Sequence, residues 1–124
     1  MGLFGKKKSA VKAELNWVEL EQSGQVDEII SESANQPIII FKHSTRCSIS
    51  DLAKNRLEHN WLIDTGDAKT YFLDLLAHRD ISNEIEQRFN VEHHSPQILV
   101  IKGGRCTYNV SHNRINPVDL KNEL

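Results

Sequence analysis

Hydrophobic residues along the chain form several runs that are typical of buried strands. Residues 38–41 are apolar at every position, which predicts a central strand covered on both faces. Residues 70–76 predict a second buried strand, and residues 98–101 predict a third. Gly103-Gly104 then predicts a two-residue hairpin turn, and the alternating pattern of residues 106–110 predicts an edge strand. The inward-facing side chains of this edge strand are predicted to be Cys106, Tyr108 and Val110.

Other stretches repeat their apolar residues every three or four positions, as amphipathic helices do. The predicted helices are residues 26–33, 47–60, 80–89 and 118–124. Pro117, which follows Asn116, suits the first position of the last helix. The buried face of the second helix is predicted to consist of Ile49, Leu52, Ala53 and Leu57.

The order of elements is therefore helix, strand, helix, strand, helix, strand, strand, helix. The first two strands can be parallel if helices cross over between them, whereas the last two form an antiparallel hairpin. This order predicts an α/β fold, with a mixed four-stranded sheet and helices on both faces, that resembles the thioredoxin-like arrangement. Residues 14–124 are expected to form this domain, and residues 1–13, with Lys6-Lys7-Lys8, a mobile basic N-terminal lead.

Composition excludes several classes of protein. The net charge of −2, with both signs interspersed, gives no electrostatic reason to expect nucleic-acid binding. No apolar stretch approaches the roughly 18 residues that a spanning helix needs, so stable membrane insertion is not expected. The N-terminus lacks the apolar core of a signal peptide, and two cysteines are too few for a secreted disulfide scaffold. We therefore expect a protein of the reducing cytoplasm.

Cys47 is the residue whose position most strongly suggests chemistry. It lies between the predicted central strand and the predicted second helix, after the polar residues 42–46. Unpaired N–H groups and the dipole of a helix N-terminus stabilise a thiolate, which is the reactive form of cysteine. The alternative is an inert buried cysteine at the end of a strand. Ser50 stands three residues later in place of a second cysteine, so a redox site here works with one thiol.

Three segments together resemble a known family. They are His43-Ser44-Thr45-Arg46-Cys47-Ser48-Ile49-Ser50, His94-Ser95-Pro96-Gln97 and Ser111-His112. From about Trp17 to the C-terminus the chain is similar to the monothiol bacilliredoxins, the YtxJ-like proteins of the bacillithiol system. That family carries Thr-Cys-Pro-Ile-Ser at its active site. Here Arg46 stands in place of the threonine and Ser48 in place of the proline.

The resemblance implies a monothiol thiol-disulfide oxidoreductase with no bound cofactor. It would remove bacillithiol, or a similar low-molecular-weight thiol, from S-thiolated cytosolic proteins, with the small thiol as co-substrate. The Cys47 thiolate would attack the mixed disulfide, and the hydroxyl of Ser50 could donate a hydrogen bond to the sulfur anion. Arg46 could lower the pKa of the thiol or bind a carboxylate of the small thiol, or it could be a solvated arginine without a role.

The same resemblance implies further site residues. Pro96 corresponds to the cis-proline that faces the active cysteine in thioredoxin-like folds, and the backbone of Ser95 could pair with an extended thiol ligand. His43, close to Cys47 in sequence, is a candidate substrate-binding residue. His112 and Arg114 occupy the region that binds the acidic end of glutathione in glutaredoxins, which makes them candidate carboxylate ligands.

Three alternatives remain open. Cys106 could be a resolving thiol, but the strand lengths place it about 20 Å from Pro96, so we expect a small core residue. The protein could instead be a binding module that holds an iron–sulfur cluster with a small thiol as co-ligand, although such glutaredoxins have Cys-Gly-Phe-Ser where this chain has Cys-Ser-Ile-Ser. It could also be a redox-inert scaffold. No metal site is expected, because the histidines lack tight ligand spacing.

Overall fold

The computed structural model describes residues 15–44, 46 and 48–124. The predicted basic lead and Cys47 both lie outside this part of the chain, so neither prediction is tested by it. The strands in this part are β1 (Val18–Glu19), β2 (Ile38–His43), β3 (Lys69–Asp74), β4 (Gln97–Lys102) and β5 (Arg105–Ser111). The helices are α2 (Gly24–Glu32), α3 (Ser48–His59), α4 (Arg79–Phe89), the short 3₁₀ helix η1 (His112–Arg114) and α5 (Pro117–Asn122).

The strands form one mixed sheet in the order β1-β3-β2-β4-β5. Strands β1, β3 and β2 are parallel, whereas β4 runs antiparallel to β2 and β5 antiparallel to β4. The predicted fold class is confirmed, but the predicted number of strands is one too low. Strand β1 was missed because it is only two residues long and both of them are exposed, so no hydrophobic pattern marks it.

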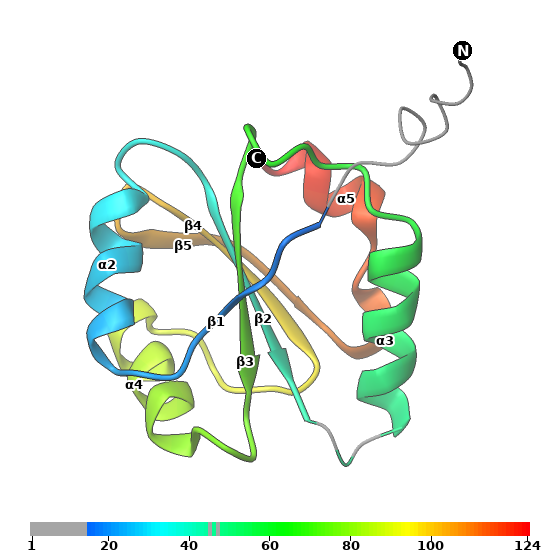
Figure 1. Cartoon of the computed structure of the whole chain (residues 1–124), viewed down its shortest axis with the longest axis horizontal. Coiled ribbons are helices and arrows are strands. Elements are labelled where there is room, and N and C mark those ends of the chain that lie inside the picture. The colour runs from blue at the N-terminus through cyan, green and yellow to red at the C-terminus, as the bar shows by residue number, and fades with distance from the viewer. Residues whose placement is uncertain (1–14, 45, 47) are drawn as a thin grey trace.

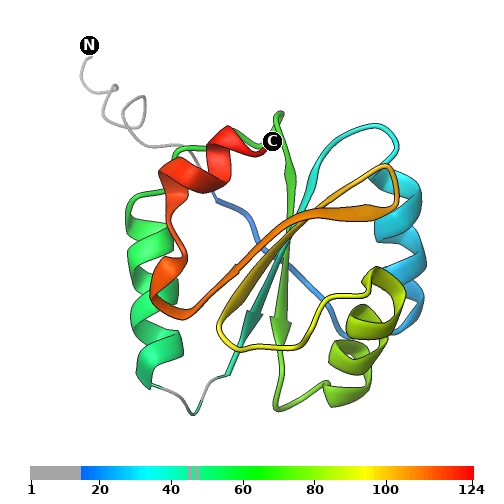
Figure 2. The same ribbon diagram turned by 180° about the vertical axis from the view of Figure 1, so that it is seen from behind.

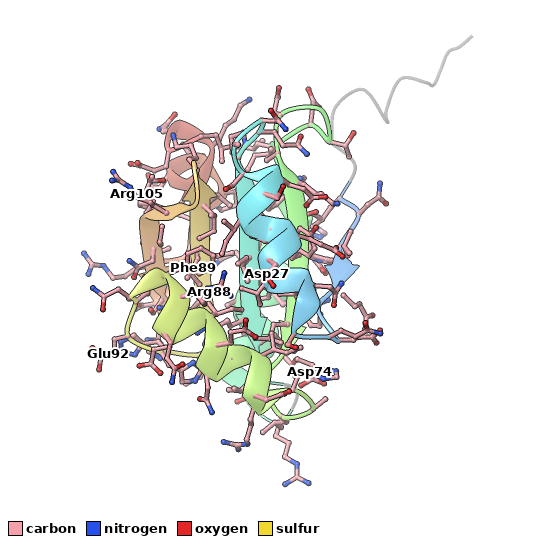
Figure 3. All side chains as sticks on the ribbon, turned by 90° about the vertical axis from the view of Figure 1, so that its left-hand side faces the viewer. Asp27, Asp74, Arg88, Phe89, Glu92 and Arg105 are labelled. Carbon is pink, nitrogen blue, oxygen red and sulfur yellow. The ribbon has the colours of Figure 1, made fainter. Side chains whose placement is uncertain are left out.

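Helices cover both faces of the sheet, as predicted (Figure 1). Helices α2 and α4 lie side by side over one face, where Arg88 bonds Asp27 across them (Figure 3). Helices α3 and α5 cover the other face, and they lie on the opposite side of the sheet from α2 and α4 in both Figure 1 and Figure 2. No helix in the described part of the chain is long and apolar enough to cross a bilayer.

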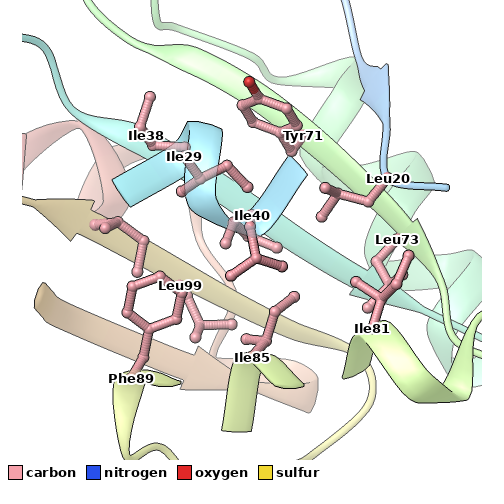
Figure 4. Close-up of a cluster of buried hydrophobic side chains, with 12 residues drawn as sticks. Leu20, Ile29, Ile38, Ile40, Tyr71, Leu73, Ile81, Ile85, Phe89 and Leu99 are labelled. Atoms are coloured by element: carbon pink, nitrogen blue, oxygen red, sulfur yellow. The ribbon is translucent and has the colours of Figure 1, made fainter. Parts of the chain in front are cut away.

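Two hydrophobic clusters fill the space between the helices and the sheet. The first lies under α2 and α4 (Figure 4), and its members include Ile29, Ile85 and Leu99. The second lies under α3 and α5 and includes Leu57, Trp61 and Val100. Successive residues of a strand point to opposite faces. Strand β2 therefore gives Ile38 and Ile40 to the first cluster and Ile39 and Phe41 to the second, which confirms its prediction as a strand buried on both faces.

Helix α3 is rotated relative to the prediction. Ile49 and Leu52 were expected in the core, but their side chains are 56% and 65% exposed. Ala53 and Leu57 face the sheet as predicted, and Ser50 faces it in place of the two exposed residues. The prediction was wrong for Ile49 and Leu52 because it ranked positions by hydrophobicity alone, whereas in the structure the buried hydroxyl of Ser50 is hydrogen-bonded to the end of β2.

The predicted face of β5 is also only partly right. Tyr108 pairs with Val100, but Cys106 pairs with Ile101, so one extra residue is inserted between them. Such a bulge reverses the side on which the following residues point. Cys106 therefore packs against the first cluster, while Tyr108 and Val110 pack against the second.

The hairpin turn and the start of α5 follow their predictions. Gly103 and Gly104 both have positive φ angles, 59° and 79°, which glycine adopts without steric cost. At the start of α5, the side-chain oxygen of Asn116 accepts hydrogen bonds from the N–H groups of Val118 and Asp119, at 2.8 and 3.2 Å. Asn116 thus satisfies backbone donors that the helix itself cannot pair.

Replacement of the cap residue, Asn116→Ala, should lower the free energy of unfolding by about 1 kcal/mol, the usual cost of losing such a cap. Urea denaturation followed by circular dichroism measures the change. Asn122→Ala, at the exposed C-terminal end of the same helix, is the matched control and should change stability by less than about 0.5 kcal/mol. Equal losses in the two variants would contradict the capping role.

Candidate functional site

The register of three strands brings three of the predicted site residues, His43, Pro96 and His112, to the same end of the sheet. Lys42 of β2 is paired with Gln97 of β4, so the next residue of β2, His43, lies beside the residue that precedes β4, Pro96. Beyond it, the N–H of His112 donates to the carbonyl oxygen of Pro96 at 2.9 Å. The end of β2, the start of β4 and the end of β5 meet at this end of the sheet (Figure 2). His43, Pro96 and His112 are thus neighbours although they are far apart in sequence.

The polar segment before Cys47 is shorter than predicted. Lys42 and His43 were assigned to the loop, but both belong to β2 and are buried. They extend the buried strand because their side chains find polar partners on opposite faces of the sheet. The loop therefore begins at Ser44.

His43 is held by groups from the first turn of α3. Its side chain is 4% exposed, and its ring packs 5.4 Å from that of Phe72, centroid to centroid. The Nδ1 atom lies 2.6 Å from Oγ of Ser50, and the Nε2 atom lies 3.3 Å from Oδ1 of Asp51. The N–H of Ser44 donates to the same Ser50 oxygen at 3.1 Å. The strand end and the helix start are therefore joined by one chain of hydrogen bonds.

The direction of this chain follows from the groups at its ends. An ionised carboxylate only accepts, so the proton of neutral His43 belongs on Nε2, facing Asp51. Nδ1 then accepts from the hydroxyl of Ser50, which itself accepts from Ser44. Burial lowers the pKa of His43 below its ordinary value, and the negative charge of Asp51 opposes that shift. His43 is thus predominantly neutral at pH 7, with a carboxylate in place to stabilise its charged form.

The predicted catalytic residues occupy different environments. Ser50 is fully buried, whereas Arg46 is exposed. Cys47 lies outside the described residues, so hydrogen bonding from Ser50 to its sulfur and an effect of Arg46 on its pKa both remain predictions. The contact between Asp51 and His43 was not predicted. The sequence offered no signal for that contact, because it depends on the rotation of α3.

The bond between Ser95 and Pro96 is cis, as the resemblance implied. Pro96 is buried, and Ser95 is half-buried. The Oγ atom of Ser95 is shielded from solvent and has no hydrogen-bond partner among the described residues. With respect to the described residues, this hydroxyl can still act as a hydrogen-bond donor and acceptor. The pairing of the Ser95 backbone with a ligand remains a prediction.

A hollow of about 340 Å³ is lined by the end of β5, by η1 and by His94; one of its lining residues, His112, is hydrogen-bonded to the carbonyl oxygen of Pro96. Its lining brings His112 and Arg114, both predicted, together with His94, which was not assigned a role. The rings of His94 and His112 meet edge to face, 5.8 Å apart between centroids. Two asparagines, Asn109 and Asn113, add amide groups to the wall. His94 could have been found from the sequence, because it precedes Ser95 in the segment that carries the resemblance.

Chemically, this hollow is suited to an anion. Arg114 is exposed and carries a fixed positive charge, and imidazole and amide N–H groups can donate hydrogen bonds to carboxylate oxygens. No group of three or more His, Cys, Asp or Glu side chains in the described ranges is arranged to bind a metal ion.

Cys106 lies at the other end of the sheet. It is paired with Ile101, which is paired with Ile38, the first residue of β2, whereas His43 is the last. Five residues of strand at about 3.3 Å each separate the two ends by about 16 Å. Burial raises the pKa of the Cys106 thiol, and its Sγ donates to the carbonyl oxygen of Tyr108 at 3.3 Å. These observations agree with the prediction of a core residue.

Removal of the charge beside His43, by Asp51→Asn, should lower the pKa of His43 further, because the carboxylate that stabilises the imidazolium is lost. The measurement is an NMR titration of the His43 ring resonances at low ionic strength. Asp80→Asn, in the first turn of α4 on the other face of the sheet, should leave that pKa unchanged. An unchanged pKa in Asp51→Asn would show that the 3.3 Å contact has no electrostatic effect on the ring.

Comparison with known proteins agrees with this fold. One solved structure, described as a proposed oxidoreductase with a thioredoxin fold, is 29% identical, with 86% of this chain and 91% of that chain covered and a TM-score of 0.73. Thioredoxins from Malassezia sympodialis (15% identity, 89% of each chain, TM-score 0.65) and Trypanosoma brucei brucei (17%, 87% of each, 0.64) share the fold. The family model "Monothiol bacilliredoxin BrxC" matches residues 18–120. The chain therefore belongs to the monothiol bacilliredoxin family and is a thiol oxidoreductase of thioredoxin-like fold.

Proposed function

We propose that this protein removes bacillithiol, or a similar low-molecular-weight thiol, from mixed disulfides on cytosolic proteins through Cys47. The observation that carries the proposal is the hollow in which His94, His112 and Arg114 meet. A small thiol with carboxylate groups needs a basic site of this kind, whereas a general dithiol reductase does not. The small thiol is the co-substrate, and the clients are S-thiolated proteins of the cytoplasm.

The reaction consists of two thiol–disulfide exchanges. In the first, the Cys47 thiolate attacks the sulfur of the small thiol, a Cys47–small-thiol disulfide forms, and the client sulfur leaves as a thiolate that takes up a proton. In the second, the thiolate of another small thiol, or of a dithiol partner, attacks this adduct and restores Cys47. The hollow directs the first attack, since it holds the small thiol and leaves the client sulfur as the leaving group.

The hydrogen bond between His43 and Ser50 would reverse its direction when the ring of His43 takes up a proton. While His43 is neutral, the hydroxyl hydrogen of Ser50 is donated to Nδ1, 2.6 Å away. If His43 takes up a proton, its Nδ1–H becomes the donor and the Ser50 oxygen the acceptor. The hydroxyl hydrogen of Ser50 is then available for a sulfur anion at Cys47. Asp51 favours this protonated state because its carboxylate faces Nε2.

The first test is intact mass spectrometry after exposure to bacillithiol disulfide and, separately, to glutathione disulfide. We expect one bacillithiol adduct in the parent protein and in Cys106→Ala, and none in Cys47→Ala. A Cys47–Cys106 disulfide would overturn the monothiol mechanism. Absence of an adduct with either disulfide would overturn the proposed function.

The second test concerns the hollow. Arg114→Gln should raise the KM for a bacillithiol mixed disulfide about tenfold with little change in kcat, because a charged hydrogen bond to the carboxylate is lost. Arg105→Gln is the matched control, since Arg105 begins β5 at the opposite end of the sheet and is also exposed. Figure 3 places Arg105 at one end of the molecule and Asp74, the register partner of His43, at the other. Equal KM values in the two variants would exclude Arg114 as a carboxylate ligand.

A further inference from the structure

A second polar group, buried on the opposite face of the sheet, is not used by the mechanism above. Lys42 of β2 is fully buried, and its Nζ atom lies 3.2 Å from Nδ1 of His93. The Oγ atom of Ser82, on α4, lies 3.1 Å from the same nitrogen. Glu86, one turn further along α4, accepts a hydrogen bond from the backbone N–H of His93 at 3.3 Å. We call these four residues the Lys42 cluster.

A fully buried lysine is rare, because its ammonium group loses its hydration. If the side chain at this position only had to fill space in the core, a methionine would serve equally well. Burial lowers the pKa of Lys42 to about 8, and the charge of Glu86 opposes the shift. Lys42 is therefore mostly protonated at pH 7, and this buried ammonium ion has a specific partner in His93.

The charge on Lys42 determines the state of His93. An ammonium group only donates hydrogen bonds, so Nδ1 of His93 must accept and the ring is neutral. Burial lowers the pKa of His93, and the charge of Lys42 lowers it further. Of the other groups that face the pair, Glu86 on α4 opposes this shift, whereas His94 and Arg79 add to it; the thiol of Cys106 on β5 faces Lys42.

The Lys42 cluster is connected to the segment that contributes His94 to the hollow. Gln97, the register partner of Lys42, is also fully buried. Its Nε2 donates to the carbonyl oxygen of Glu92 at 3.0 Å, and its Oε1 accepts from the N–H of His94 at 3.3 Å. Lys42 of β2 and its partner Gln97 of β4 thus hold residues 92–94 through hydrogen bonds. His94, Ser95 and Pro96 follow His93 directly in the chain, and His94 forms part of the wall of the hollow.

We propose that Lys42 and His93 are positioning residues for the thiol-binding hollow, and that uptake of a proton by His93 releases the loop that carries His94 and Ser95. In the neutral state, Nδ1 of His93 accepts from Lys42 and Ser82 and holds the loop against β2 and α4. A proton on Nδ1 removes the acceptor and places two cations next to each other. The identity of the ligand rests on the proposed function, but the coupling between His93 and the loop does not.

A pair of His93 variants separates positioning from simple packing. His93→Asn keeps an acceptor at the position of Nδ1 but cannot titrate, whereas His93→Leu removes the acceptor. We expect His93→Leu to raise the KM for a bacillithiol mixed disulfide about tenfold, the effect of one lost hydrogen bond to a charged group, with kcat within about twofold. His93→Asn should restore the KM. Equal KM values in both variants would overturn the positioning role.

NMR titration tests the coupling without any substrate. The amide resonances of His94 and Ser95 should shift with the same midpoint as the His93 ring, below about pH 6.5, and this transition should vanish in His93→Asn. Lys42→Met should raise the pKa of His93, because a neighbouring cation is removed, whereas Lys102→Met at the far end of β4 should not. If the ring titrates and the amides do not follow, the proposal fails even where bacillithiol reacts. If bacillithiol does not react but the amides follow, only the proposed function fails.

Discussion

Complete burial of the central strand is the constraint on which the rest of the site depends. Every residue of β2 is buried, because helices cover both faces of the sheet and strands flank both edges of β2. The last two residues, Lys42 and His43, are polar, and neither side chain reaches water. A buried polar group without a partner is strongly destabilising, so each must be satisfied from within the protein. The chain does so with the two segments that border the site.

Strand geometry sends the two side chains to opposite faces. His43 points toward α3, where Ser50 and Asp51 contact its ring, and the contact fixes the rotation of that helix. Lys42 points toward α4 and contacts His93, next to the loop with the cis-proline. One strand end thereby contacts both the start of α3, which directly follows Cys47 in sequence, and the loop that contributes His94 to the hollow. Because the side chains of consecutive strand residues point to opposite faces, two neighbouring residues can contact elements on both sides of the sheet.

Sequence alone predicted the parts of this arrangement that depend on local pattern. The apolar run of residues 38–41, the Gly103-Gly104 turn and the Asn116-Pro117 helix start each carry their own signal, and the structure confirms them. The family likeness supplied the cis bond before Pro96. What sequence could not supply was the burial of polar residues. Lysine and histidine after an apolar run suggest a loop, and only the partners on α3 and α4, distant in sequence, keep them in the strand.

The same reasoning explains the two errors in side-chain direction. Hydrophobicity placed Ile49 inside and left Ser50 unspecified, but the buried ring of His43 requires a hydroxyl, so α3 turns Ser50 inward and leaves Ile49 exposed. In β5, an alternating pattern predicts one face, but it cannot reveal an inserted residue. The bulge moves Cys106 to the face opposite Tyr108, where it is half-buried against the first cluster.

This placement of Cys106 bears on why a binding hollow is needed at all. A dithiol enzyme regenerates itself with its own second cysteine, and its intramolecular thiol needs no recognition site. Here Cys106 lies at the opposite end of the sheet from His43 and the start of α3, and burial raises the pKa of its thiol. A thiol that is remote and protonated cannot resolve a disulfide near His43. Under the proposed function the second thiol therefore comes from outside the chain, and the basic hollow lined by His94, His112 and Arg114 is the site that would bind it.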